Sequence, residues 1–176
     1  PGLSPQIQIL KEGEPVTSFF TWVHKRDSNG DPLWEDTNGS GEIEPIDVYK
    51  DQDGDGDIDR EDRVITGTPQ PDWILGHTSR FTYSGFDLSF TVRAHLGQQV
   101  YNNVASANGS FFQIEGGVPS NMHESVLETG FDSAQILSDY YVEDASFVRL
   151  DNVTLGYTLD ALPGVDQLRV YGRVSN

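Results

Sequence analysis

The chain has 176 residues, with 18 Gly, 9 Pro, 11% aromatic and 36% hydrophobic residues, and no apolar run long enough for a membrane helix; this composition favours one all-β domain's worth of chain. A formal net charge of −17, with only 11 Lys and Arg, argues against nucleic acid as a partner and favours cations. The absence of Cys excludes disulfides, zinc–thiolate sites and cysteine nucleophiles.

Residues 1–24 are expected to hold one or more strands, and residues 25–71 form a long connection that carries a calcium-type loop. Residues 51–62 match the twelve-residue template in which a hard cation takes six to eight oxygens around a sharp turn, with Gly56 at the turn. Asp62 stands where Glu is usual, and its shorter side chain weakens the expected two-oxygen contact. The candidate ligands are Asp51, Asp53, Asp55, Asp57, Asp59 and Asp62. The alternative is a solvated turn, which packed carboxylates disfavour because they repel one another.

A weaker copy of the template lies upstream, between residues 36 and 47. Its candidate ligands are Asp36, Asn38, Ser40, Glu42 and Asp47. For this loop a calcium site and a plain polar turn are equally consistent with the residues. Pro45, Pro69 and Pro71, together with the β-rich stretch 46–49, leave no room for the long helices of an EF-hand pair, so both loops are expected to lie on β structure.

Residues 72–101 predict a β-hairpin. In the stretch 86–96, apolar residues alternate without a break with polar ones, among them Thr91, Arg93 and His95, so one face of this strand is apolar and the other polar. Ser84-Gly85 predicts a tight turn from the preceding strand. Residues 146–176 predict a second hairpin with the same alternation, turning at Pro163-Gly164, and residues 102–145 form a second long connection.

Short turns at one end and long loops at the other are typical of outer-membrane barrels, and eleven strand residues tilted by about 40° rise roughly 28 Å, close to the apolar band of such a barrel. The sequence therefore favours an antiparallel transmembrane β-barrel segment of about four or five strands with two long extracellular loops. A soluble β-sandwich with decorated loops fits the periodicity nearly as well.

Catalytic motifs are absent. His123-Glu124 lacks a second His four residues after the first, and the sequence has no nucleophile elbow and no phosphate-binding loop. Paired carboxylates for glycoside hydrolysis remain open, because their separation is a property of the folded chain. The residues therefore favour a protein that is not an enzyme.

Several blocks of the sequence together resemble the C-terminal barrel portion of SusC/RagA-type TonB-dependent transporters of the Bacteroidetes outer membrane. They are the stretches 11–22, 51–59, 62–73, 83–90, 147–157 and 168–171, which span nearly the whole chain in the order and spacing of that family. This chain shows no signal peptide, plug domain or terminal aromatic strand, so the resemblance implies a fragment of the longer protein.

The resemblance implies a section of a nutrient importer for oligosaccharides or peptides, in the outer membrane of a Gram-negative bacterium, working with a SusD-like lipoprotein and energised by TonB through parts outside this chain. Phe86, Leu88, Phe90 and Val92 would then face outer-membrane lipid, and Arg93 and His95 would face the lumen and its substrate, unless lumen water or a plug salt bridge accounts for them. Calcium would be structural. The alternatives are a secreted calcium-stabilised β domain that binds carbohydrate or protein, and a hydrolase fragment.

Overall fold

A computed structural model describes residues 7–115, 121–162 and 165–176, and the chain divides into two units. Unit 1 comprises residues 1–70 and 99–144, and unit 2 comprises residues 71–98 and 145–176. Each unit is thus built from two separate stretches of chain. Among the described residues, no helix combines the length and the apolar character needed to cross a membrane.

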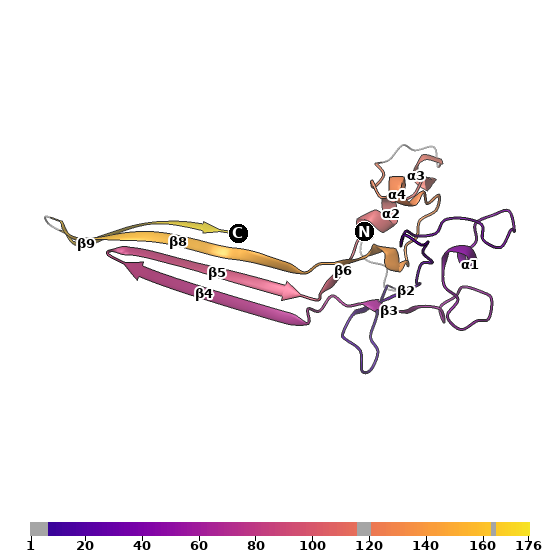
Figure 1. Cartoon of the computed structure of the whole chain (residues 1–176), viewed down its shortest axis with the longest axis horizontal. Coiled ribbons are helices and arrows are strands. Elements are labelled where there is room, and N and C mark those ends of the chain that lie inside the picture. The colour runs from indigo at the N-terminus through magenta and orange to yellow at the C-terminus, as the bar shows by residue number, and fades with distance from the viewer. Residues whose placement is uncertain (1–6, 116–120, 163–164) are drawn as a thin grey trace. The chain divides into compact units, whose positions relative to one another are not determined.

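Unit 2 is a sheet of four long antiparallel strands in the order β4-β5-β8-β9 (Figure 1). The strands are β4 (Trp73–Tyr83), β5 (Phe86–Leu96), β8 (Phe147–Leu162) and β9 (Val165–Ser175). Ser84 and Gly85 join β4 to β5 with positive φ angles of 45° and 83°, as a two-residue hairpin turn requires, so the predicted tight turn is confirmed. The turn predicted at Pro163-Gly164 lies outside the described residues. In the described chain β4 and β9 each pair on one side, and the sheet is open.

One face of this sheet is mainly apolar and the other mainly polar, although His77 and Ser79 of β4 lie on the apolar face. Directly paired residues share a face, and the pairs Phe81 with Leu88 and Leu88 with Leu155 place large apolar side chains side by side. On this apolar face the exposed residues are Trp73, Leu75, Phe81, Tyr83, Phe86, Val148, Leu150, Leu155, Tyr157, Leu168, Val170 and Val174. No second sheet buries them within the described chain. The sandwich alternative therefore loses its main requirement, a covered apolar face.

Unit 1 contains short elements around the hydrophobic core. One sheet has the order β1-β2-β3, and a second pairs β6 with β7. The elements are β1 (Gln8–Ile9), β2 (Ser18–Thr21), α1 (Pro45–Val48), β3 (Val64–Gly67), β6 (Gln99–Tyr101), α2 (Asn103–Asn108), α3 (Phe112–Glu115), α4 (Val126–Thr129), the 3-10 turn η1 (Asp139–Tyr141) and β7 (Val142–Asp144). The buried core residues are Ile7, Phe19, Tyr101, Ala105, Phe131, Leu137 and Tyr141.

The structure differs from the sequence expectation at three places in unit 1. The strand at residues 18–21 pairs with β1 and β3 instead of with the long strands, so it belongs to a different sheet from the hairpin at 73–96. Residues 99–101 pair with β7, outside that hairpin. The stretch 46–49, expected to be extended, begins in the single helical turn α1, because Pro45 is preset for a first helical position and the Asp47 carboxylate accepts the amide of the N-cap residue Glu44 at 2.9 Å.

Candidate functional site

The acidic loop at residues 51–62 is wound tightly around its own carboxylates. Both oxygens of Asp51 accept backbone amides, from Gly54 at 2.6 Å and from Gly56 at 3.0 Å. Both glycines have φ near +90°, which side chains with a Cβ rarely adopt, so glycine is required at these turns. The chain thus bends around its first aspartate as the calcium template demands.

The carboxylates of three of the predicted ligands lie close together. Asp51, Asp53 and Asp55 each place a carboxylate oxygen within 4.8 Å of the others. The Asp55 amide donates a hydrogen bond that lowers the pKa of Asp53, but desolvation and the nearby carboxylates of Asp55, Asp62 and Asp51 outweigh it, and the pKa of Asp53 is raised. This repulsion is what a bound cation would relieve.

Asp62 is the last residue of the loop and is only 1% exposed. Its carboxylate accepts the amide of Asp59 at 2.8 Å and that of Gln52 at 2.7 Å. These hydrogen bonds hold the pKa of Asp62 below its usual range. Asp57 and Asp59 are exposed. The Asp59 carboxylate accepts a hydrogen bond from the amide of Glu61. At the position of Asp57 the calcium template uses only the backbone carbonyl.

The upstream loop, residues 36–47, repeats this winding 15 residues earlier (Asp36 for Asp51, Asp47 for Asp62). Asp36 accepts the amides of Gly39 at 2.6 Å and Gly41 at 2.7 Å. Asp47, fully buried, accepts the amides of Thr37 and Glu44, as Asp62 does from the matching positions. Hydrogen bonds from Glu44 and from the Thr37 hydroxyl lower the pKa of Asp47.

The two loops differ in the oxygens that they offer. Asn38 and Ser40 stand where the downstream loop has Asp53 and Asp55. The Ser40 hydroxyl donates to the carbonyl of Glu42 at 3.0 Å, the oxygen that the template assigns to the ion. The upstream loop therefore shares the shape of the downstream one but has less negative charge, because the positions that match Asp53 and Asp55 are neutral. Its donor set fits a cation less well than that of residues 51–62.

Arg93 and His95, predicted to face the lumen, lie on the polar face of unit 2. Arg93 forms an ion pair with Asp151 at 3.2 Å, and Arg149 forms a second with the same carboxylate at 2.8 Å. The His95 ring lies 4.9 Å from that of Phe147. Arg93 is thus held in place by its own sheet, and His95 lies on the same face against a different neighbour.

Asp151 is a feature that the alternation did not predict. The register shifts between Thr91 and Val92, which pair with Asn152 and Leu150, so Asp151 is an extra residue that bulges out of β8. The signal is the polar pair Asp151-Asn152 inside an otherwise alternating strand. The bulge keeps apolar residues on one face on both sides and directs Asp151 to both arginines.

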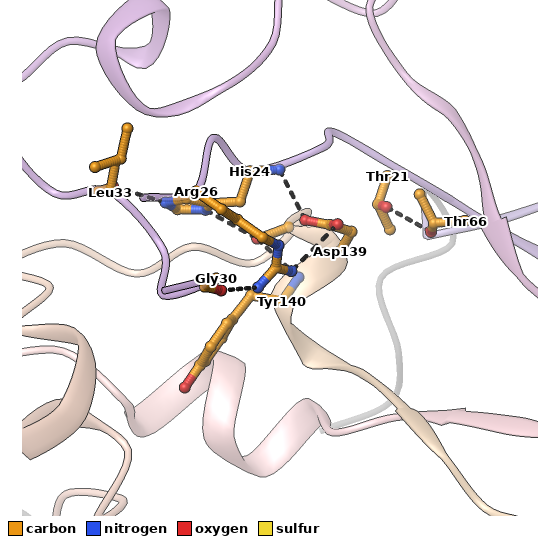
Figure 2. Close-up of polar contacts among 9 residues, drawn as sticks. Thr21, His24, Arg26, Gly30, Leu33, Thr66, Asp139 and Tyr140 are labelled. Carbon is orange, nitrogen blue, oxygen red and sulfur yellow. Dashed lines mark hydrogen bonds and ion pairs between the residues drawn. The ribbon is translucent and has the colours of Figure 1, made fainter. Parts of the chain in front are cut away.

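A buried polar cluster in unit 1 also had no sequence signal (Figure 2). His24 is fully buried; its ring accepts from or donates to the Ser138 hydroxyl at 3.2 Å, and its other ring nitrogen contacts the Leu33 carbonyl at 2.9 Å. Asp139 accepts the His24 amide at 2.8 Å and lies 3.5 Å from the Arg26 guanidinium. Burial lowers the pKa of His24 despite the opposing effects of the Leu33 hydrogen bond and Asp139. The cluster ties residues 24–33 to residues 138–140.

Comparison with known proteins places these features in a class. No family model matches the chain. The TonB-dependent receptor SusC of Bacteroides thetaiotaomicron is 31% identical over 185 aligned residues, which cover 99% of this chain and 17% of the receptor. The TonB-dependent receptor P3 of Formosa agariphila is 32% identical over 181 residues, covering 96% of this chain and 18% of that protein.

Solved structures share the fold. The structure of the RagAB peptide transporter matches with a TM-score of 0.58 and 18% identity, over 98% of this chain and 21% of the matched chain. The RagAB peptide importer in the closed-closed state gives a TM-score of 0.60 at 18% identity, over 100% of this chain and 21% of the other.

The open antiparallel sheet, its exposed apolar face and these matches define part of a TonB-dependent receptor. The chain spans 17–18% of the length of the two receptors compared by sequence. Within that class it belongs to the SusC/RagA type, which confirms the family expected from the sequence blocks; its position in the C-terminal barrel portion stays a prediction. Its relatives are receptors and not enzymes.

Proposed function

We propose that this chain is a section of the C-terminal wall and outer surface of an outer-membrane nutrient importer. Unit 2 supplies four strands of a larger transmembrane barrel, and residues 25–71 and 102–145 are its extracellular loops. The observation that carries the proposal is the segregation of the sheet: exposed apolar residues cover one face, whereas ion pairs of Arg93, Arg149 and Arg169 lie on the other. Such a sheet suits lipid on one side and water on the other.

The importer would act with a SusD-like lipoprotein and with TonB, the latter through parts outside this chain. Similarity to a peptide transporter supports a peptide as the imported substrate, and an oligosaccharide is the other substrate that the family resemblance implies. The lumen-side residues of this section are Arg93 and His95, on the polar face of β5. A secreted calcium-stabilised domain is the less favoured reading, since it would leave the apolar face of unit 2 in water.

Adjacent positions of β5 give a direct test of membrane orientation. Because this chain contains no Cys, a spin label can be placed at Leu88→Cys or at Ser89→Cys in the complete gene product in lipid, after removal of any Cys elsewhere. Leu88 pairs with apolar Phe81 and Ser89 with Arg80, so the two labels point to opposite faces. We expect the label at position 88 to be relaxed by oxygen dissolved in lipid, and the label at 89 by a water-soluble nickel complex. Equal relaxation by the nickel complex at both positions would contradict the proposal.

Calcium is the ion that we propose for the loop at residues 51–62, with a structural role at the extracellular surface. Asp51, Asp53 and Asp55 would supply side-chain oxygens and Asp57 its carbonyl, while Asp59 would act directly or through water and Asp62 closes the loop. The same ion in residues 36–47 would have the ligands Asp36, Asn38, Ser40, Glu42 and Asp47. In both loops, bound calcium would order the loop surface and would have no catalytic role.

Calorimetric titration of the complete gene product with calcium tests this assignment. Asp51→Ala and Asp55→Ala should abolish the heat of the stronger site, whereas Asp132→Ala, which removes an exposed acid outside both loops, should leave it unchanged. Asp36→Ala then reports on the upstream loop alone. Identical heats in wild type and the two loop variants would refute the calcium assignment for residues 51–62 without affecting the membrane proposal.

A further inference from the structure

A pocket of about 550 Å³ lies in unit 1 beside the end of the downstream acidic loop. Its wall comes from segments far apart in the sequence: the strands β1 and β2, the last turn of the loop, and the stretch before η1. The lining residues are Gln8, Ile9, Phe20, Trp22, Arg60, Arg63 and Leu137. This volume lies in the range of pockets that hold small molecules.

The charge of this pocket is opposite to that of the chain. The net charge is −17, yet the two ionisable residues in the described lining are Arg60 and Arg63. Arg63 is only 8% exposed and Arg60 is exposed, so the lining carries one buried and one accessible guanidinium group. An anion placed between them would be attracted by both.

Aromatic rings give the pocket flat apolar surfaces. The Arg63 guanidinium carbon lies 4.8 Å from the centre of the Phe20 ring and 5.7 Å from that of Trp22. The Trp22 indole nitrogen donates to the Asp59 carbonyl at 2.5 Å, which fixes the ring against the acidic loop. Phe19, one residue earlier, is buried in the core, whereas Phe20 is half-buried and lines the pocket. The side chains are therefore positioned before any ligand arrives.

We propose that this pocket binds a carboxylate carried on a flat or apolar body. The exposed Arg60 would pair with the carboxylate, Arg63 would add positive potential from the wall, and the rings of Phe20 and Trp22 would cover the body of the ligand. A planar carboxylate matches the guanidinium fork. Two sources share this chemistry: the free C-terminus of a peptide and a uronic acid of a glycan.

Two matched pairs of small probes test the pocket by calorimetry on the complete gene product in detergent. The first pair is N-acetylphenylalanine and its amide, and the second is glucuronate and glucose. Each pair differs at the group that should meet Arg60, so we expect binding of at least one charged probe and at least about tenfold weaker binding of its neutral partner. Binding of the first acid alone assigns a peptide terminus, and binding of glucuronate alone assigns a glycan.

Variants locate the binding. Arg60→Ala should weaken the charged probe about tenfold, and Arg60→Lys should restore part of the loss, because it returns the charge without the fork. Lys11→Ala, which removes an exposed cation outside the pocket lining, is the control and should change nothing. Equal binding of charged and neutral probes, binding unaffected by Arg60→Ala, or no binding of either acid would overturn the proposal. None of these outcomes depends on the membrane orientation of unit 2.

Discussion

Unit 1 and unit 2 differ in whether their apolar residues form a buried core. In unit 1, Phe131 and Tyr141 are fully buried in such a core, although other apolar residues of the unit, such as Leu127, remain exposed. In unit 2, Val174 and Val148 are 75% and 69% exposed, and the ion pairs of Arg93 and Arg169 gather on the other face. Unit 1 thus has a core of its own, whereas unit 2 leaves one apolar face exposed, as the proposed contact with lipid requires. The comparison teaches that successive stretches of one chain can bury their apolar residues in one unit and expose them in the other.

The largest expected effect is loss of the unit 1 core. Phe131 packs against His24 and Trp34, with ring centres 5.2 and 5.0 Å away. Phe131→Ala should destabilise unit 1 by about 3–5 kcal/mol, because it removes transfer energy and leaves a cavity. Hydrogen exchange of peptides from unit 1 would show this as loss of protection. Unchanged protection there would mean that the cluster is not a core.

A charge on the apolar face of unit 2 should be costly by contrast with one on the polar face. Phe90→Arg places a cation where lipid is proposed and should reduce stability in lipid by about 2–4 kcal/mol near the midplane. Ser89→Arg, its neighbour on the polar face, is the control and should cost far less. Urea unfolding in vesicles measures both. Equal losses from the two substitutions would remove the distinction between the faces.

Acid should loosen unit 1 through His24 while leaving unit 2 protected. Because burial lowers its folded-state pKa below 6.5, neutral His24 contributes stability that is fully present above pH 6.5 and is lost as pH falls from there toward the lowered value. The charged groups that face it are Asp139 and Arg26, of which Asp139 opposes the shift. Hydrogen exchange at pH 7 and 5, corrected for intrinsic rates, should show loss of protection in residues 24–33 and 138–141.

The control for this effect is His24→Gln, which cannot titrate. It should lower protection at both pH values but remove most of the pH dependence. If the variant loses protection on acidification as much as the wild type does, another group is responsible and the assignment to His24 is wrong.

Unit 2 was largely predictable because period-two alternation is a local signal. The hairpin of residues 72–96 and its turn at Ser84-Gly85 followed from residues adjacent in sequence. The upstream acidic loop also adopts the winding of the downstream one, since Gly and Asp at fixed positions decide such a turn.

Unit 1 was not predictable in the same way. Its core joins Ile7, Phe19, Tyr101 and Phe131, which are separated by long stretches and share no periodicity. The helices α1, α3 and α4 have four residues each, too short for a repeating apolar pattern. The cluster at His24 and the pocket at Arg60 depend on the same long-range packing, and only the folded chain brings their residues together.

The bulge at Asp151 gives β8 a place where its length can change. Removing Asp151 would leave Leu150 followed by Asn152 and Val153. The apolar and polar residues of β8 would then still alternate on the same two faces before and after the deletion. Loss of any single residue between 153 and 159 would instead move the side chains on one side of the deletion to the opposite face of the sheet. Length variants of this wall segment should therefore be tolerated at one site, the place where two arginines share one acid.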